Sequence, residues 1–188
     1  MERDFNFNVL DVIRNRWSSR SFKKKQFTLN DILPLIEAAR YAPSAYNEQP
    51  WFFLISVTRQ ENEKVIDVLS ESNKLWAENA SAFIIILARK NFSHNNSFNR
   101  WHFFDAGTSF GFLALEAENR GIAVHPMAGF NHDLLIKNFK ISGDYDPVTV
   151  IAVGYRDIPD VLPEKIRINE KPGLRNALSS IYKKIEDI

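Results

Sequence analysis

An uninterrupted apolar run near the middle of the chain constrains the fold more than any other feature. Residues 81–88 include Phe83-Ile84-Ile85-Ile86-Leu87 and are typical of a strand that is covered on both faces. A second buried strand is expected over residues 148–155. The apolar stretch from Ala80 to Ala88 is far too short to span a bilayer.

Segments with helical periodicity alternate with the expected strands. Helices are predicted over residues 6–15, from Thr28 as N-cap to about Tyr41, over 60–72, over 101–120, from 131 or 132 to about 139, and from 174 to about 186. Shorter strands are predicted over 51–58 and 122–124, and an extended tail through Pro159, Pro163 and Pro172. No repeat or linker divides the chain, so we expect one domain over residues 1–188. The predicted class is α/β (or α+β), with a mixed central sheet flanked by helices.

The composition excludes several functions. The 188 residues include 24 Lys+Arg and 23 Asp+Glu, so a formal net charge of +1 gives no reason to expect nucleic acid or an acidic membrane as partner. Cysteine is absent, which excludes disulfides, Cys-ligated zinc and thiol nucleophiles. The first residues are charged and lack the apolar run of a signal peptide, so we expect a cytoplasmic protein.

Aromatic residues are unusually frequent, at 15 Phe, 5 Tyr and 4 Trp. They favour either a Phe-rich core or a pocket for a flat ligand or a large subunit interface. Composition does not choose between these interpretations.

Known catalytic motifs are missing. The chain has no Gly-x-Gly-x-x-Gly after a strand, no Gly-x4-Gly-Lys-Ser/Thr, no His-Glu-x-x-His and no Gly-x-Ser-x-Gly. We therefore expect no metal site and nominate no side chain as a catalytic acid, base or nucleophile.

A dispersed set of groups suits a phosphorylated, planar ligand. Arg16, Ser18 and Arg20 alternate, so in an extended segment they point to one side and offer donors to an anion. Lys165 and Arg167 repeat this alternation in the Pro-rich tail. Other groups suit the ring of such a ligand: the amides of Asn47 and Gln49, and the backbone N–H groups of residues 126–129, where glycine permits close approach.

These pieces resemble, in order along nearly the whole chain, the motifs of the flavin-dependent nitroreductases. Arg16-Trp17-Ser18-Ser19-Arg20-Ser21-Phe22 resembles the family's Arg-x-Ser-x-Arg/Lys-x-Phe motif. Residues 42–51 resemble its Ala-Pro-Ser-x-x-Asn-x-Gln-Pro-Trp signature, the most specific of the set. Asp105-Ala106-Gly107 is similar to the start of its central helix, residues 126–130 to its Pro-x-x-Gly-Phe turn, and residues 163–167 to its Pro-x-Lys-x-Arg tail.

The resemblance implies FMN, bound in two sites at the interface of a homodimer. By position, the implied FMN-binding residues are Arg16, Trp17 (through its backbone), Ser18, Arg20, Pro43, Ser44, Asn47, Gln49, Asn73, Pro126, Met127, Ala128, Gly129, Lys165 and Arg167. Arg16, Ser18, Lys165 and Arg167 would contact the phosphate, and Arg20 would stabilise the negative charge of reduced flavin. The loop of residues 43–50 would reach the flavin of the other subunit.

This chain departs from the family pattern at three places. Ala128 stands where many members have an acidic residue, and Trp76 where some have a lysine near the pyrimidine ring. The excursion over residues 90–104 is shorter than in larger members, so a more open substrate site is implied. Whether Phe98, Trp101, His102 or Phe103 edge that site is left open.

The resemblance implies an oxidoreductase that passes reducing equivalents from NADH or NADPH through FMN to a nitroaromatic, quinone or similar small acceptor. The alternative is an FMN-binding protein that stores or senses flavin without efficient turnover. Two more alternatives keep the fold: reductive dehalogenation or flavin destruction, and a domain whose motifs have decayed. The sequence does not separate NADH from NADPH.

Overall fold

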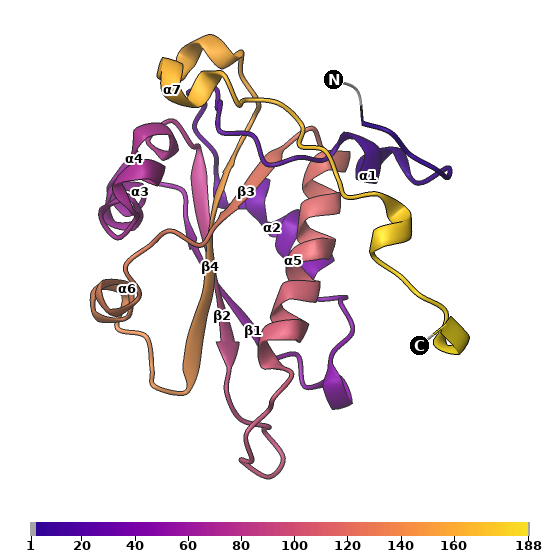
Figure 1. Ribbon diagram of the computed structural model, residues 1–188. Helices are drawn as coiled ribbons and strands as arrows, with labels where there is room; N and C mark the ends of the chain where they lie inside the picture. Colours follow the sequence, from indigo (N-terminus) through magenta and orange to yellow (C-terminus); the bar gives the residue numbers. More distant parts are fainter. Residues whose placement is uncertain (1–2, 188) are drawn as a thin grey trace.

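The structure is a computed structural model that describes residues 3–187 (Figure 1). Its helices are α1 (Asp11–Asn15), α2 (Leu29–Ala39), α3 (Arg59–Asp67), α4 (Glu71–Ala77), α5 (His102–Asn119), α6 (His132–Phe139) and α7 (Glu164–Arg167). Its strands are β1 (Trp51–Ser56), β2 (Ala82–Arg89), β3 (Ala123–Met127) and β4 (Tyr145–Gly154). Short 3-10 turns span Ala45–Asn47, Pro159–Val161, Leu178–Ser180 and Ile185–Asp187.

The strands form one four-stranded sheet in the order β1-β2-β4-β3. The predicted class, a sheet flanked by helices, is confirmed, but all three pairings are antiparallel, so the expectation of a mixed sheet is corrected. Pro126 lies in β3, which is an edge strand, where a residue without an N–H is tolerated.

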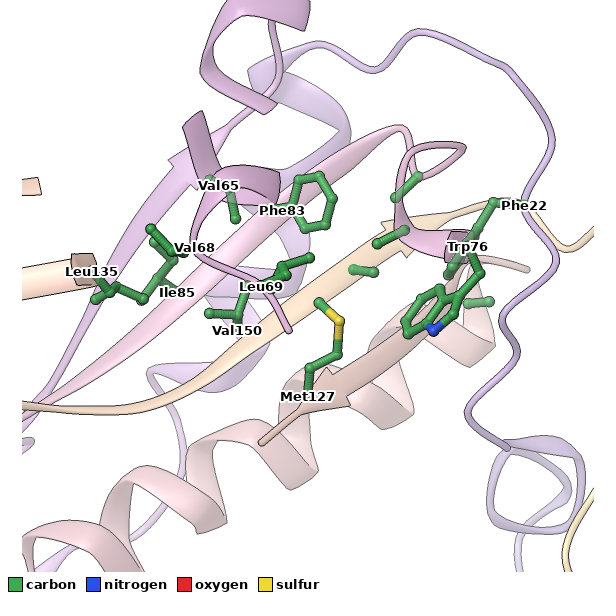
Figure 2. Close-up of a cluster of buried hydrophobic side chains, with 14 of the residues drawn as sticks. Phe22, Val65, Val68, Leu69, Trp76, Phe83, Ile85, Met127, Leu135 and Val150 are labelled. Atoms are coloured by element: carbon green, nitrogen blue, oxygen red, sulfur yellow. The ribbon is translucent and has the colours of Figure 1, made fainter. Parts of the chain in front are cut away.

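Strand β2 is buried on both faces, as its apolar run predicts. Phe83, Ile85 and Leu87 pack into one core cluster with residues of α3, α4 and α6, which Figure 2 shows. Ile84 and Ile86, on the alternate face, pack into a second cluster with residues of α2 and α5. Figure 1 shows these helices on opposite sides of the sheet.

Several predicted elements are confirmed. Helix α5 spans nearly all of the predicted segment 101–120, and α6 begins after Asn131, whose side chain accepts a hydrogen bond from the Leu134 N–H at 2.9 Å. Helix α2 begins with the capping box of Thr28 and Asp31.

The helix predicted over residues 60–72 is divided into α3 and α4. Leu69 forms an isolated bridge with Phe130, the Ser70 N–H donates to the Gly129 carbonyl at 2.9 Å, and the Asn131 N–H donates to the Val68 carbonyl at 2.7 Å. These tertiary hydrogen bonds use the backbone groups that a continuous helix would need. They also fix the turn after β3 against the start of α4.

Of the helices predicted at the two ends of the chain, the first is confirmed only in its second half, as α1 (Asp11–Asn15), and the second is wrong. Residues 6–10 are not helical, and Phe7 and Leu10 are 71% and 68% exposed, so these two side chains are not buried against the described part of the chain. The segment after Leu174 contains only 3-10 turns, with Ile181 66% exposed. A short helix without a packed apolar face is marginal in water, which explains both errors.

The boundaries of two strands also differ from the prediction. Strand β3 continues to Met127, so His125, Pro126 and Met127 belong to the sheet and not to a loop. Strand β4 already begins at Tyr145. The excursion after β2 is closed by hydrogen bonds, among them Phe92 N–H to the Ser97 carbonyl at 2.8 Å.

No helix in the described part of the chain is long and apolar enough to cross a membrane.

Candidate functional site

The basic segment, residues 16–21, runs extended between α1 and a bridge that pairs Phe22 with Arg156. Ser19 and Ser21 are buried, whereas Arg16, Ser18 and Arg20 stay partly exposed, as the alternation predicts. The side chains that can bind an anion therefore share the accessible face of an otherwise enclosed segment.

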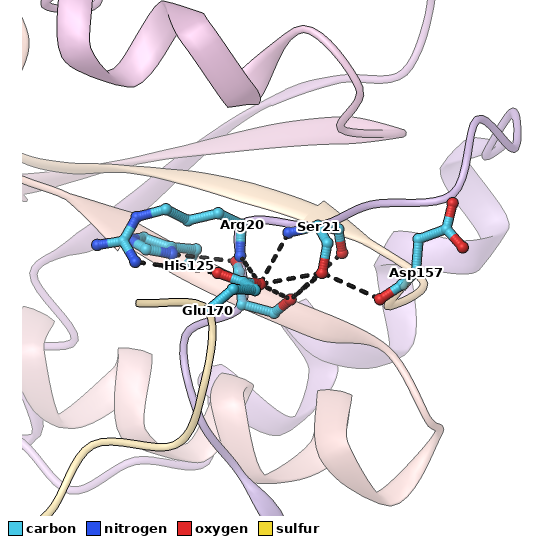
Figure 3. Close-up of polar contacts among 6 residues, drawn as sticks. Arg20, Ser21, His125, Asp157 and Glu170 are labelled. Atoms are coloured by element: carbon cyan, nitrogen blue, oxygen red, sulfur yellow. Dashed lines mark hydrogen bonds and ion pairs between the residues drawn. The ribbon is translucent and has the colours of Figure 1, made fainter. Parts of the chain in front are cut away.

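Glu170 holds the buried face of the basic segment, and Figure 3 shows the contacts. Its Oε1 accepts hydrogen bonds from Ser19 Oγ at 2.7 Å, the Arg20 N–H at 2.7 Å, the Ser21 N–H at 3.0 Å and Ser21 Oγ at 3.0 Å. Burial alone would raise the pKa of Glu170, but these hydrogen bonds outweigh burial and hold the pKa below its usual range. Nothing in the sequence singles out Glu170, because a lone Glu in a polar tail carries no motif.

His125 supports the same segment from β3. Its Nδ1 lies 3.0 Å from the Ser19 carbonyl oxygen, and since a carbonyl only accepts, Nδ1 carries the proton. Its ring packs on the buried Trp76, with centroids 4.5 Å apart. Burial lowers the pKa of His125 to about 4, so the side chain is neutral at pH 7. Trp76 itself belongs to the core and is 1% exposed.

Positive charge accumulates beside Arg16. Burial lowers the pKa of Arg16, and the nearby charge of Arg175 lowers this pKa further. Glu118 raises the pKa, and Arg156 lowers it. Glu118 already forms a two-point ion pair with Arg156. Among the described residues, no carboxylate lies within ion-pair distance of Arg3, Arg16 or Arg175.

Arg3 adds orphaned donors at the same place. Its Nη1 donates to the Arg14 and Arg16 carbonyls at 3.0 and 2.8 Å, whereas its Nε and Nη2 are buried and have no hydrogen-bond partner among residues 3–187. Buried donors of this kind are costly unless something accepts from them. The donors of Arg3, beside the end of α5 that carries Glu118, therefore suit an anionic acceptor.

The spacing argument for Lys165 and Arg167 is wrong. Both lie in α7, where residues two apart point in nearly opposite directions, and not in an extended tail. Pro163 is the N-cap that directly precedes this helix. Arg167 faces Asp160 at 3.5 Å, and the cation of the tail that acts on Arg16 is Arg175.

The signature loop, residues 43–50, is exposed and held in an unusual backbone conformation. Tyr46, Asn47 and Gln49 have φ angles of 53°, 56° and 51°, in the left-handed region that non-glycine residues seldom adopt. Such conformations persist only where surrounding contacts impose them, and they concentrate at functional sites.

Three contacts impose the conformation of the signature loop. Ser44 Oγ accepts from the Gln49 N–H at 2.9 Å, and the buried Asp105 of α5 accepts from the Ala45 N–H at 3.1 Å. Glu48 accepts from the Ser93 N–H at 2.7 Å. Burial raises the pKa of Asp105. Pro43, Asn47 and Gln49 remain exposed, and Ser44 is half-buried.

The turn after β3 brings Asn73 and Gly129 together, because Asn73 Nδ2 donates to the Gly129 carbonyl at 3.0 Å. A Cβ on Gly129 would lie 2.7 Å from Ser70 Oγ and 2.8 Å from Asn73 Nδ2. Any larger residue would displace these two side chains, so glycine permits the close approach of α4, which its sequence motif alone does not indicate. Met127 is buried in the core, so only its backbone can face a ligand, while Ala128 is exposed and Pro126 half-buried.

His102 is not available to a substrate. It is 3% exposed, with Nδ1 2.8 Å from the Asn99 carbonyl oxygen and Nε2 3.1 Å from Asp146 Oδ2. Phe98, Trp101 and Phe103 are 63%, 46% and 48% exposed. Phe22, Phe27 and Phe83 are buried, so the aromatic residues serve both a core and an exposed surface.

One chain does not bring all predicted site residues together. The signature loop is tied to Asp105 at the start of α5, and the charges around Arg16 surround Glu118 near its end. At 1.5 Å per residue these positions are about 20 Å apart. The basic segment and the turn after β3 meet through His125, but the signature loop lies at the opposite end of α5 (Figure 1).

Comparisons with known proteins agree with this architecture. A sequence model described as "Nitroreductase family" matches residues 13–75 and 57–155. This chain belongs to the nitroreductase family.

Curated relatives match over part of their length. A putative NADH dehydrogenase/NAD(P)H nitroreductase of Archaeoglobus fulgidus is 37% identical over 79 residues, 42% of this chain and 44% of that protein. An oxygen-insensitive NADPH nitroreductase of Helicobacter acinonychis is 34% identical over 80 residues, 42% of this chain and 38% of that protein. The matched region thus spans less than half the length of these relatives.

Solved structures match over nearly the whole chain. A structure described as an oxidoreductase containing FMN has a TM-score of 0.92 at 28% identity, covering 97% of this chain and 94% of that one. A putative nitroreductase of Exiguobacterium sibiricum, in complex with FMN, has a TM-score of 0.78 at 18% identity, covering 96% and 99% of the chains, and supports the fold alone.

Proposed function

We propose that this protein binds FMN and uses it to pass reducing equivalents from NADH or NADPH to a small acceptor such as a nitroaromatic or a quinone. The observation that carries the proposal is the unmatched positive charge of Arg3, Arg16 and Arg175 beside the basic segment. The relatives named NAD(P)H nitroreductases and the FMN-containing structural neighbour support it.

The residues present fit a flavin mononucleotide. The buried, unpartnered donors of Arg3 and the guanidinium of Arg16 suit a phosphate dianion, with Ser18 as a further donor. Arg175 is the tail residue that we favour as their partner, and Lys165 and Arg167 stay predictions from the resemblance. Trp17 would contribute its backbone.

The remaining residues would hold the ring. Arg20 would place a fixed positive charge beside its pyrimidine end, where negative charge develops on reduction. Pro126, the Met127 backbone, Ala128 and Gly129 would line the ring, with Asn73 holding the turn through the Gly129 carbonyl.

We propose that the signature loop completes the site of a second copy in a homodimer. Pro43, Ser44, Asn47 and Gln49 would serve the partner's site, because they lie about 20 Å along α5 from the basic segment of their own chain. Helix α5 offers a surface for that copy. Gly107 and Gly111 are exposed, with nothing within 4 Å of the place where a Cβ would lie, and Phe104 and Phe112 are 69% and 41% exposed.

FMN when bound supplies the redox chemistry, namely acceptance of a hydride from reduced nicotinamide and its delivery to the acceptor. The side chains of this chain bind, orient and set the electrostatic field. His125 is neutral at pH 7 and hydrogen-bonded to Ser19, so it supports the basic segment without adding charge. No side chain is assigned a proton transfer.

An absorbance spectrum of the purified protein with FMN, recorded without air before and after NADH or NADPH is added, tests this function. Loss of the flavin bands on adding either nicotinamide is the expected result. Flavin bands that persist with both would favour the storage or sensing alternative. A protein that takes up no FMN would contradict the proposal.

A further inference from the structure

Glu170 is enclosed to an unusual degree for a carboxylate. It follows α7 in the C-terminal tail, and its side chain has 0% relative exposure. The residues that it contacts lie about 150 positions earlier in the chain. Buried carboxylates are retained only where hydrogen bonds or cations compensate their lost hydration.

The two oxygens of Glu170 have different surroundings. Oε1 accepts all four hydrogen bonds from Ser19, Arg20 and Ser21. Oε2 is buried and has no hydrogen-bond partner within the described part of the chain, and Arg20 Nη1 lies 4.0 Å away. Arg20 is therefore the cation on which the second oxygen depends.

Arg20 contacts this one carboxylate at both ends, through a hydrogen bond from its backbone N–H and an ion pair of 4.0 Å from its guanidinium. Its backbone N–H is bound to Oε1, and its guanidinium faces Oε2 while its side chain stays 36% exposed. A flexible arginine loses entropy when it binds a ligand, and an arginine that is already oriented loses less.

We propose that Glu170 is a positioning residue of the FMN site, which acts through Arg20 by fixing both its backbone and the direction of its guanidinium. This inference rests on the proposed function, because it assigns Arg20 to the flavin. It makes the C-terminal tail part of the binding machinery although no atom of Glu170 touches the cofactor.

A double-mutant cycle on the full chain tests the proposal. FMN affinity is measured by fluorescence titration of the FMN-free protein for wild type, Glu170→Gln, Arg20→Ala and the double variant. We expect each single substitution to weaken binding about tenfold and the double variant to be no weaker than Arg20→Ala alone within about threefold. Glu164→Gln, an exposed Glu of the same tail, serves as the matched control and should bind as wild type does.

A role confined to holding the tail gives a different result. The effects of Glu170→Gln and Arg20→Ala would then multiply, which would overturn the proposal. If wild type itself binds no FMN, the proposed function fails first, so the two failures are distinguishable.

A second double-mutant cycle tests the same proposal if Glu170→Gln does not fold. Ser19→Ala removes the 2.7 Å hydrogen bond to Oε1 and leaves the buried charge in place. We expect Ser19→Ala to weaken FMN binding severalfold in the otherwise wild-type chain. In the Arg20→Ala variant the same substitution should have no further effect. Equal effects in both backgrounds would contradict the proposal.

Discussion

The basic segment and the signature loop both carry family motifs but are held in different ways. The basic segment is tied to its own chain by Glu170 and His125 and presents its arginines on a rigid support. Most of the signature loop is exposed, and three of its residues lie in the left-handed region. The loop contacts its own chain through Asp105 and Ser93 and through Tyr46, which packs on Phe92 and His94. This difference is why we propose that the basic segment forms one half of the FMN site within a single chain, whereas the signature loop serves a second copy.

The largest effect is expected from Gly111→Arg, which places a bulky cation on the exposed face of α5. Nothing lies within 4 Å of the added side chain's first atom, so the chain itself should fold. The dimer should be lost, and FMN affinity should fall by more than about a hundredfold because all contacts of the partner's loop disappear together. Analytical ultracentrifugation and FMN titration measure both.

Gly143→Arg is the matched control for this variant, because Gly143 is equally exposed and unobstructed. It should remain dimeric and bind FMN. A monomeric Gly111→Arg variant with wild-type affinity would show that one chain holds the entire site.

Acid should destabilise the folded chain through His125, which supports the basic segment. Its pKa is about 4 in the folded chain, against about 6.5 in an unfolded chain. Between these values the unfolded state binds more protons, so the free energy of unfolding should fall as the pH drops from about 6.5 to about 4, by at most about 3 kcal/mol. Below pH 4 this contribution should stay constant.

Urea unfolding at several pH values between about 4 and 6.5 measures this change in the free energy of unfolding. In His125→Asn the free energy of unfolding should depend less on pH than in wild type. His94→Asn is the control, because His94 is exposed. An identical pH dependence in His125→Asn and wild type would show that the neutral His125 does not contribute to stability as we predict.

Arg16→Ala should weaken FMN binding about tenfold to a hundredfold, since a hydrogen bond to a charged group contributes about 1.5–3 kcal/mol. Stability without FMN should fall little or even rise, because the removed charge is repelled by Arg175. Isothermal titration and thermal unfolding separate the two effects. Arg59→Ala, on the exposed start of α3, is the matched control. Unchanged affinity would contradict the phosphate assignment.

Ser44→Ala should have the smallest effect. It removes the 2.9 Å hydrogen bond from the Gln49 N–H and loosens the signature loop. We expect a loss of FMN affinity of about threefold to tenfold, and a change in the free energy of unfolding below about 1 kcal/mol, because the loop is exposed. A large loss of stability with unchanged affinity would mean that the loop serves its own chain.

The sequence predicted best what depends on local pattern. The buried strand β2, helix α5 and the capping box of α2 follow from alternation, length and capping residues. It failed where tertiary contacts decide, as at Leu69, where pairing with Phe130 divides a helix, and after Leu174, where no surface of the chain covers the apolar residues.

The site shows the same division. The alternation at Arg16, Ser18 and Arg20 was readable from the sequence, and the anchors Glu170 and His125 were not, because their partners lie far away in the chain. The spacing of Lys165 and Arg167 gave a wrong prediction. It places both side chains on one side of an extended segment, whereas in helix α7 the same spacing separates them. The cytoplasmic location, the homodimer and the binding roles stay predictions.

Mixing two defective chains tests the composite site most directly. Arg16→Glu disables the basic segment, and Asn47→Glu places a charge on the exposed signature loop. Each variant alone should bind almost no FMN, whereas co-expressed chains should form mixed dimers with one intact site each, about a quarter of all sites. Recovery of about that fraction of FMN binding is the result that our account predicts. No recovery in verified mixed dimers would contradict a site shared between two copies.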